Sequence, residues 1–255
     1  MIQKRRLDTI MGILKDEGMV DVKTLSQRLE VTEKTVRLDL KELENQNLVE
    51  RVHGGAVLKI QTMSLSSRKS SRRLSHLEQK QRIARRALTL IREDDVILLD
   101  DGSTTQELAN LLGDFRVTVL TNDLLIVNEL MYKPNVTLYI IGGLVRRDSD
   151  SYIVTGEDAI QFLKKYRVSK LFLGTSTVDT KEGLMIFNYG DNFTKRAFID
   201  ATDQVICLAD SSKFERTAFT KVARLDDVDT FVTDSGLDQD VIDRYEGLGK
   251  KLIVV

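Results

Sequence analysis

Apolar side chains in the N-terminal part of the chain recur at helical spacing and predict three helices. An i, i+3, i+4, i+7 pattern that begins at Leu7 indicates an amphipathic helix over Lys4–Glu17. A shorter apolar repeat follows, and Thr32 then stands where its hydroxyl can cap a third helix by accepting a backbone N–H. Two helices joined by a short turn, the second one capped, are typical of a helix-turn-helix. The expected buried stripes are Leu7, Ile10, Met11, Leu14; Val22, Leu25, Leu29; and Val36, Leu40, Leu43.

The third helix is predicted to turn a basic side away from its apolar stripe. At about 100° per residue, the outward positions are Lys34, Arg37, Leu38 and Lys41. Such a helix fits the major groove of DNA, where lysines suit phosphates and Arg37 suits either a guanine edge or a phosphate. Leu38 either meets a thymine methyl group or is an incidental surface leucine, and both interpretations stay open. A three-helix unit that binds another protein is the alternative, which the capped basic helix disfavours.

Two short apolar runs around Gly54-Gly55 predict a hairpin over residues 48–58, of the kind that forms a wing beside a helix-turn-helix. Arg51 and His53 stand where a wing reaches phosphate or the minor groove, although a lone histidine is more often structural.

Beyond residue 77 short β-branched runs alternate with helical stretches, which is typical of an α/β domain with a largely parallel sheet. Residues 59–77 are rich in Ser and Arg without periodicity. We therefore expect a winged helix-turn-helix over 1–58, a linker over 59–77 and an α/β domain over 78–255. The expected strands are Val96–Leu99, Val117–Leu120, Val136–Ile141, Lys170–Leu173, Gln204–Leu208, Thr230–Val232 and Lys251–Val255. The expected helices are Glu78–Ile91, Thr104–Leu112, Leu124–Tyr132, Glu157–Tyr166, Phe193–Ala201 and Gln239–Leu248.

Charge divides along the same line. Residues 1–86 hold 19 basic and 11 acidic side chains, a net charge of +8, whereas residues 87–255 hold 19 and 28, a net charge of −9. A basic N-terminal part followed by an acidic C-terminal part favours a polyanionic partner that binds the N-terminal part only. A merely solvated linker is the alternative explanation for the basic residues that precede the α/β domain.

Composition excludes several other classes of protein. No apolar run approaches the roughly 18 residues of a membrane span, and the N-terminus lacks the apolar stretch of a signal peptide. We therefore expect a cytoplasmic protein without a membrane partner. The single cysteine, Cys207, excludes an intramolecular disulfide and a multi-cysteine metal site. A small buried residue is the favoured interpretation of Cys207, ahead of a reactive thiol.

One turn of the α/β domain has the composition of an anion site. After the strand that ends at Leu99, the segment DDGSTT places Gly102 and the hydroxyl residues Ser103, Thr104 and Thr105 at the start of a helix. Free N–H groups at the positive end of a helix dipole bind anions. The alternative is that the hydroxyls only cap the helix. No GK[ST] follows the glycine, so the turn is not a P-loop.

Further polar residues follow other expected strands, and ligands of open α/β sheets gather at the carboxyl ends of strands. Lys213 offers a point charge to the same anion, unless it is simply solvated. Asp179 carries a carboxylate, which suits sugar hydroxyls better than phosphate. The remaining candidates at strand ends are Gly142, Gly143 and Ser176.

Residues 31–56 (VTEKTVRLDLKELENQNLVERVHGGA) resemble the helix-turn-helix signature of the DeoR family of bacterial transcription regulators. They depart from it at Leu38, where the family commonly has a second arginine. The matching positions are Thr35, Arg37, Asp39, Leu40, Leu43 and 53–56. The C-terminal half resembles the family's sensor domain in DDGSTTQELA (100–109), LTND (120–123), IIGG (140–143), Gly156, EGL (182–184) and ADSSKF (209–214).

This resemblance implies a sensor similar in fold to ribose-5-phosphate isomerases and coenzyme A transferases. It also implies a phosphorylated sugar or sugar-like effector that releases DNA, and repression of catabolic or uptake genes. Double-stranded operator DNA is then a partner, and paired half-sites imply a homo-oligomer, either a dimer or a tetramer. The candidate DNA-binding set is Thr32, Lys34, Thr35, Arg37, Leu38, Lys41, Arg51 and His53. The candidate effector-binding set is Asp101, Gly102, Ser103, Thr104, Thr105, Asn122, Gly142, Gly143, Ser176, Asp179, Lys195 and Lys213.

An isomerase-like enzyme fused to a DNA-binding module is the alternative function. The related isomerases need a general base in an acid-rich loop. Here the loop 174–179 holds one acid, and Thr194 precedes Lys195, the lysine that matches theirs. We therefore expect no catalytic residue, no cofactor and no metal. A DNA-architectural protein without any ligand is a third interpretation, which the intact 102–105 turn disfavours.

Overall fold

A computed structural model of the 255-residue chain describes residues 3–17, 19–45, 48–52, 54–58, 74–147, 151–187 and 190–255. The chain divides into two compact units, Met1–Ser64 and Leu65–Val255, which are described separately. The division falls inside the segment 59–77 that the sequence assigns to a linker, and residues 59–73 of that segment lie outside the described residues.

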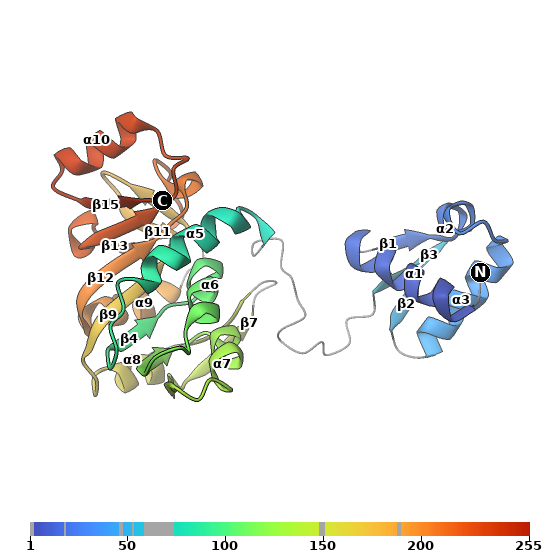
Figure 1. Cartoon of the computed structure of the whole chain (residues 1–255), viewed down its shortest axis with the longest axis horizontal. Coiled ribbons are helices and arrows are strands. Elements are labelled where there is room, and N and C mark those ends of the chain that lie inside the picture. Colours follow the sequence, from blue (N-terminus) through green and yellow to red (C-terminus); the bar gives the residue numbers. More distant parts are fainter. Residues whose placement is uncertain are drawn as a thin grey trace. The chain divides into compact units, whose positions relative to one another are not determined.

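The N-terminal unit is a winged helix-turn-helix, as the sequence predicts (Figure 1). Its helices are α1 (Gln3–Glu17), α2 (Val22–Arg28) and α3 (Glu33–Asn45), and its strands are β1 (Met19–Asp21), β2 (Val49–Val52) and β3 (Gly55–Leu58). The hairpin of β2 and β3 gains β1 as a third antiparallel strand, in the order β1-β3-β2. Gly55 permits this close pairing, because a Cβ at that position would stand 2.0 Å from the carbonyl oxygen of Val20.

Two contacts set the geometry of α3. The Thr32 hydroxyl accepts the backbone N–H of Thr35 at 3.2 Å, which is the cap that the sequence predicts. Arg6 of α1 donates from Nε and Nη2 to the carboxylate of Asp39 on α3, at 2.5 and 2.9 Å, and both side chains are buried. Removal of one partner of a buried pair leaves an uncompensated charge, so this ion pair fixes α1 against α3. The three expected apolar stripes form the core around it.

The C-terminal unit is built on a seven-stranded, fully parallel sheet in the order β15-β14-β12-β9-β4-β5-β6. The strands are β4 (Val96–Leu99), β5 (Val117–Thr121), β6 (Val136–Ile140), β9 (Val168–Gly174), β12 (Thr202–Leu208), β14 (Thr230–Thr233) and β15 (Lys251–Val254). Each corresponds to an expected strand. Five further short strands are β7 (Leu144–Arg147), β8 (Tyr152–Thr155), β10 (Thr177–Asp179), β11 (Gly183–Ile186) and β13 (Thr220–Ala223).

Helices cover both faces of this sheet, and two apolar clusters fill the space between the layers. The first face packs against α5 (Leu77–Leu88), α6 (Ser103–Leu111) and α7 (Leu124–Leu130). The other face packs against α8 (Glu157–Leu163), α9 (Asp191–Asp200), α10 (Gln239–Gly247) and the small antiparallel sheet of β10, β11 and β13. The sequence predicts that the first of these helices runs from Glu78 to Ile91, but α5 ends at Leu88. The N–H of Thr89 bonds to the carbonyl of Arg86, three residues earlier, which closes the helix with a 3-10 turn.

The strand order reverses beside β4. From β4 the chain adds β5 and β6 on one side, then crosses to place β9 on the other and continues outward to β15. The carboxyl ends of β4 and β9 therefore border the switch point of the sheet, which is where open α/β sheets bind their ligands. Figure 1 shows α6 leaving β4 at this edge.

Candidate functional site

The outer side of α3 has the composition that the sequence predicts. Lys34, Arg37, Leu38 and Lys41 are exposed, whereas Val36, Leu40 and Leu43 are buried. Arg37 is paired with Glu33, one turn earlier, with Nη2 2.6 Å from the carboxylate. Leu38 is 57% exposed, so it contributes nothing to the core of the unit. The exposed face of α3 thus carries three cations, the acid Glu33 and one apolar side chain.

The remaining DNA candidates fall on the cap and the wing. The hydroxyls of Thr32 and Thr35 lie 2.9 Å apart at the start of α3. Arg51 is exposed on β2. His53 lies outside the described residues, so its role stays a prediction.

The turn between β4 and α6 is shaped by Gly102. Its φ of +146° belongs to the region that favours glycine. No side chain caps α6, so the first N–H groups of the helix are directed outward without an intrahelical acceptor. The Thr105 hydroxyl donates its proton to the carbonyl of Gly102 at 2.8 Å. Of the three hydroxyls proposed as donors, Thr105 is therefore committed to the turn itself, which leaves Ser103 and Thr104.

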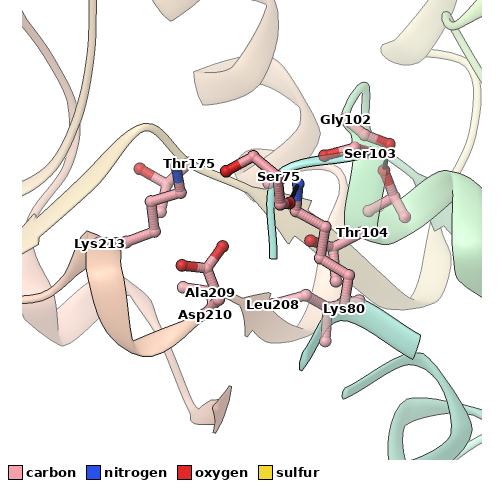
Figure 2. Close-up of a pocket in the computed structure, with 12 residues that line it drawn as sticks. Ser75, Lys80, Gly102, Ser103, Thr104, Thr175, Leu208, Ala209, Asp210 and Lys213 are labelled. Carbon is pink, nitrogen blue, oxygen red and sulfur yellow. Dashed lines mark hydrogen bonds between the residues drawn. The ribbon is translucent and has the colours of Figure 1, made fainter. Parts of the chain in front are cut away.

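This turn forms one wall of a cavity of about 110 Å³ at the switch point, which we call the effector pocket after the role proposed for it below. Figure 2 shows Lys213 on one side, Lys80 with Ser75 on the other, and the carboxylate of Asp210 between them. Two ammonium groups and a helix N-terminus against one carboxylate give the effector pocket a positive balance. Its lining is Ser75, Lys80, Gly102, Ser103, Thr104, Thr105, Gly174, Thr175, Leu208, Ala209, Asp210 and Lys213.

The two lysines are held differently. Lys80 of α5 is buried, and its Nζ donates to the carbonyl oxygen of Ser75 at 2.6 Å. Lys213 is half-buried at the end of the short 3-10 helix Ser211–Lys213, and its ammonium has no ion-pair partner among the described residues. Asp210 accepts the backbone N–H of Ser212 at 3.2 Å, which fixes this turn. Lys213 therefore brings to the effector pocket an ammonium group that no described carboxylate pairs.

Lys195 lies beside the effector pocket in a buried cluster of charges. Its Nζ donates to Asp100 at 2.5 Å and to Asp101 at 2.7 Å. Burial alone would lower the pKa of Lys195, but these two carboxylates raise it above its ordinary value, so the lysine stays charged. Burial raises the pKa of Asp100 although Lys195 opposes the change. The Asp100 carboxylate also accepts the N–H of Gly174 at 2.8 Å, which ties the end of β4 to the end of β9.

Several candidate effector residues lie apart from the effector pocket. The Asn122 amide donates to the carbonyl of Val154 at 3.0 Å, and Gly142 and Gly143 are exposed after β6. Asp179 accepts the backbone N–H groups of residues 181 and 182, both at 2.8 Å, so its carboxylate closes the turn between β10 and β11. Ser176 lies with Asp101 and Lys195 in a second, smaller pocket.

The candidate effector set lacks seven lining residues of the effector pocket, of which Ser75, Lys80, Thr175 and Asp210 have polar side chains. Lys80 sits on a helix face, Ser75 belongs to the segment assigned to a linker, and Thr175 and Asp210 were passed over at strand ends. Of these four, only Asp210 had a signal in the sequence, because it belongs to the same ADSSKF segment as Lys213.

Known proteins match both units. The model of the DeoR-like helix-turn-helix domain matches residues 6–62, and that of the DeoR C terminal sensor domain matches residues 75–235. The chain belongs to the DeoR family of transcription regulators. The glycerol-3-phosphate regulon repressor of Escherichia coli is 33% identical over 92% of both chains. The repressor GlcR of Bacillus subtilis is 32% identical over all of this chain and 97% of its own.

The family assignment decides among the functions that the sequence left open. This DeoR-family chain is a DNA-binding transcription regulator, and the prediction that it is not an enzyme is confirmed.

Among solved structures, ribose 5-phosphate isomerase A from Methanocaldococcus jannaschii aligns with 55% of each chain at 18% identity and a TM-score of 0.41. No helix of the described residues is long and apolar enough to span a membrane.

Proposed function

We propose that this regulator represses genes of carbohydrate uptake or catabolism, and that a phosphorylated sugar or related metabolite in the effector pocket releases it from its operator. It acts in the cytoplasm as a dimer or tetramer that binds paired half-sites. The E. coli relative is named for the glycerol-3-phosphate regulon, and a second E. coli relative is a putative aga operon repressor. Both names support a carbohydrate-related target.

The positive balance of the effector pocket is the observation that carries the proposal. A phosphate monoester has a charge of about −1.5 to −2 and three acceptor oxygens. The outward N–H groups of α6, the hydroxyls of Ser103 and Thr104, and the ammonium groups of Lys80 and Lys213 are all donors. Hydrogen bonds to a charged group contribute about 1.5–3 kcal/mol each, against roughly 0.5–1.5 kcal/mol for neutral ones. The effector pocket therefore favours a phosphate over a sugar hydroxyl.

The exposed face of α3 supports the other half of the proposal. Arg37 and the lysines at 34 and 41 are accessible and lie on one side of the helix. We assign Lys34 and Lys41 to phosphates, and Arg37 to a base edge or a phosphate. The effector must bind the DNA-free arrangement more tightly than the DNA-bound one, because equal affinity for both shifts nothing.

The test begins with an operator selected from random duplex DNA, whose complex with the full chain is titrated with sugars in phosphorylated and free form. We expect release by a phosphorylated sugar at concentrations at least tenfold below those of the free sugar. Lys213→Ala should weaken this response at least tenfold while operator affinity without the sugar stays the same. Lys251→Ala, which removes an exposed lysine on the edge strand β15, is the matched control. Equal potency of free sugar and phosphate, or an unchanged response in Lys213→Ala, contradicts the proposal.

A further inference from the structure

A second, smaller pocket adjoins the effector pocket and shares Gly174 and Thr175 with it. Its volume is about 30 Å³. A site needs roughly 10–15 Å³ of such volume to hold one water molecule, so the smaller pocket has room for one or two groups of hydroxyl size. It has no room for a second phosphate. Its other lining residues are Asp101, Ser176, Ile186, Phe187, Asp191 and Lys195.

Asp191 supplies an acceptor to this smaller pocket. It is the first residue of α9 and is 6% exposed. One carboxylate oxygen, Oδ2, accepts from Nη2 of Arg146 on β7. The other, Oδ1, is buried and has no hydrogen-bond partner among the described residues. A buried polar atom without a partner costs about 1–3 kcal/mol, and more when it is charged, so Oδ1 is suited to a donor that a ligand brings.

The cations of the smaller pocket are already committed. Lys195 donates to Asp100 and Asp101, and its remaining contact is the carbonyl of Gly174 at 3.5 Å. Arg146 is paired with Asp191. The carboxylates of Asp100, Asp101 and Asp191 thus outnumber the two cations, Lys195 and Arg146. The resulting net negative charge opposes the entry of another anion. The Thr175 hydroxyl donates to the carbonyls of residues 177 and 185. Asp191 is therefore the lining carboxylate with an oxygen that accepts no hydrogen bond from the described residues.

We propose that the smaller pocket is a specificity subsite in which Asp191 accepts a hydrogen bond from a hydroxyl group of the effector. The inference rests on the proposed function, in which the phosphate of the same molecule occupies the effector pocket. It narrows the effector to a polyhydroxy monophosphate, because a bisphosphate or a sugar acid would bring a second anion to this acidic end. Arg146 acts as a positioning residue that holds Asp191 toward the ligand.

The experiment measures binding to the full chain by calorimetry. The panel contains inorganic phosphate, n-propyl phosphate, glycerol 3-phosphate, ribose 5-phosphate, glucose 6-phosphate, fructose 6-phosphate, fructose 1,6-bisphosphate and 6-phosphogluconate. In the wild type we expect at least one hydroxyl-bearing monophosphate to bind tenfold or more tighter than n-propyl phosphate. It should exceed by the same factor fructose 1,6-bisphosphate and 6-phosphogluconate, each of which has a second anionic group. In Asp191→Asn this advantage should fall by about tenfold, because a neutral acceptor replaces a charged one. Affinity for inorganic phosphate and n-propyl phosphate should stay within twofold.

Two further variants separate ligand contact from structure. Asp200→Asn changes the acid at the other end of α9, which is paired with Arg196 on the surface, and should alter no affinity. Arg146→Gln leaves the Asp191 carboxylate in place without its partner, and should weaken hydroxyl-bearing ligands alone. The subsite is contradicted if Asp191→Asn loses affinity equally for all phosphates, or if it prefers hydroxyl-bearing phosphates as strongly as the wild type does. Neither result would contradict phosphate binding in the effector pocket. If wild-type protein binds no phosphate of the panel, the proposed function itself fails.

Discussion

Asp123 illustrates how burial at the ligand edge of the sheet changes the ionisation of a single residue. It caps α7 by accepting the N–H of Leu125 at 2.7 Å, and it accepts the N–H of Gly102 at 3.4 Å. Burial, together with the nearby charge of Asp101, raises its pKa from the ordinary 3.8 to about 6. Asp123 therefore holds the 102–105 turn by a hydrogen bond and destabilises the fold when it is ionised.

The raised pKa of Asp123 predicts a change of stability with pH. The folded chain holds this proton more tightly than the unfolded chain, so the contribution of Asp123 to stability falls as the pH rises from about 4 to about 6. The Asp123→Asn variant has no carboxyl group at this position and so does not lose stability in this way as the pH rises. Its free energy of unfolding, relative to the wild type, should therefore improve by on the order of 2–3 kcal/mol between pH 4 and pH 7. Urea unfolding of both proteins across this range is the measurement.

The comparison between the two proteins cancels the titration of the other buried acids, Asp100 and Asp191, whose pKa values burial also raises. A difference in unfolding free energy that stays constant from pH 4 to pH 7 would show that Asp123 titrates normally in the fold.

At the scale of elements, α3 carries the prediction for DNA recognition. Replacement of Arg37 by Ala should weaken specific operator binding by roughly 1–3 kcal/mol if the guanidinium pairs with a base, and it should relax specificity at that base pair. Lys41→Ala should instead weaken binding to all sequences and reduce the salt dependence by about one phosphate contact. Gel-shift titrations at several salt concentrations distinguish the two effects.

Glu33 provides a control within the same helix, because it holds Arg37 in an exposed i,i+4 ion pair. Such a pair contributes only a few tenths of a kcal/mol, so Glu33→Gln should leave the fold unchanged and bind the operator at least as tightly as the wild type. An Arg37→Ala protein with wild-type operator affinity would remove α3 from base recognition.

Elements were predictable in proportion to their length and periodicity. The helix stripes and the buried parallel strands gave patterns long enough to assign, and all seven strands of the main sheet were expected. The strands that escaped, such as β1 with three residues and β11 with four, are too short to show alternation. They form through pairing with distant partners, as β11 does with β13, and that pairing leaves no local pattern.

At the scale of the whole molecule, the site depended on more than local sequence. The 102–105 turn and Lys213 were predictable because both follow parallel strands, and such ends share one edge of a sheet. Between their strands, β4 and β12, stands β9, which the sequence could not order. Lys80 was not predicted, because the pattern of an amphipathic helix does not show which of its basic residues will lie at a ligand site in the folded protein. Asp191 was not predicted, because the side chains that surround it in the fold decide whether one of its oxygens lacks a hydrogen-bond partner.

The two units have separate apolar cores, which predicts two unfolding transitions. The core of the N-terminal unit draws on residues 10–56 alone, and the two clusters of the C-terminal unit draw on residues 83 and beyond. A ligand of the effector pocket should therefore raise one transition and leave the other in place. At a free concentration of about 100 times Kd the gain is about 2.7 kcal/mol, which corresponds to roughly 5–10 °C for a domain of this size. Differential scanning calorimetry with the most tightly bound sugar phosphate makes the measurement, and Lys213→Ala should lose most of the upward shift at the same concentration. A single transition that rises as a whole would mean that the DNA-binding and sensor units unfold together, and operator release would then have to be explained by a contact between them.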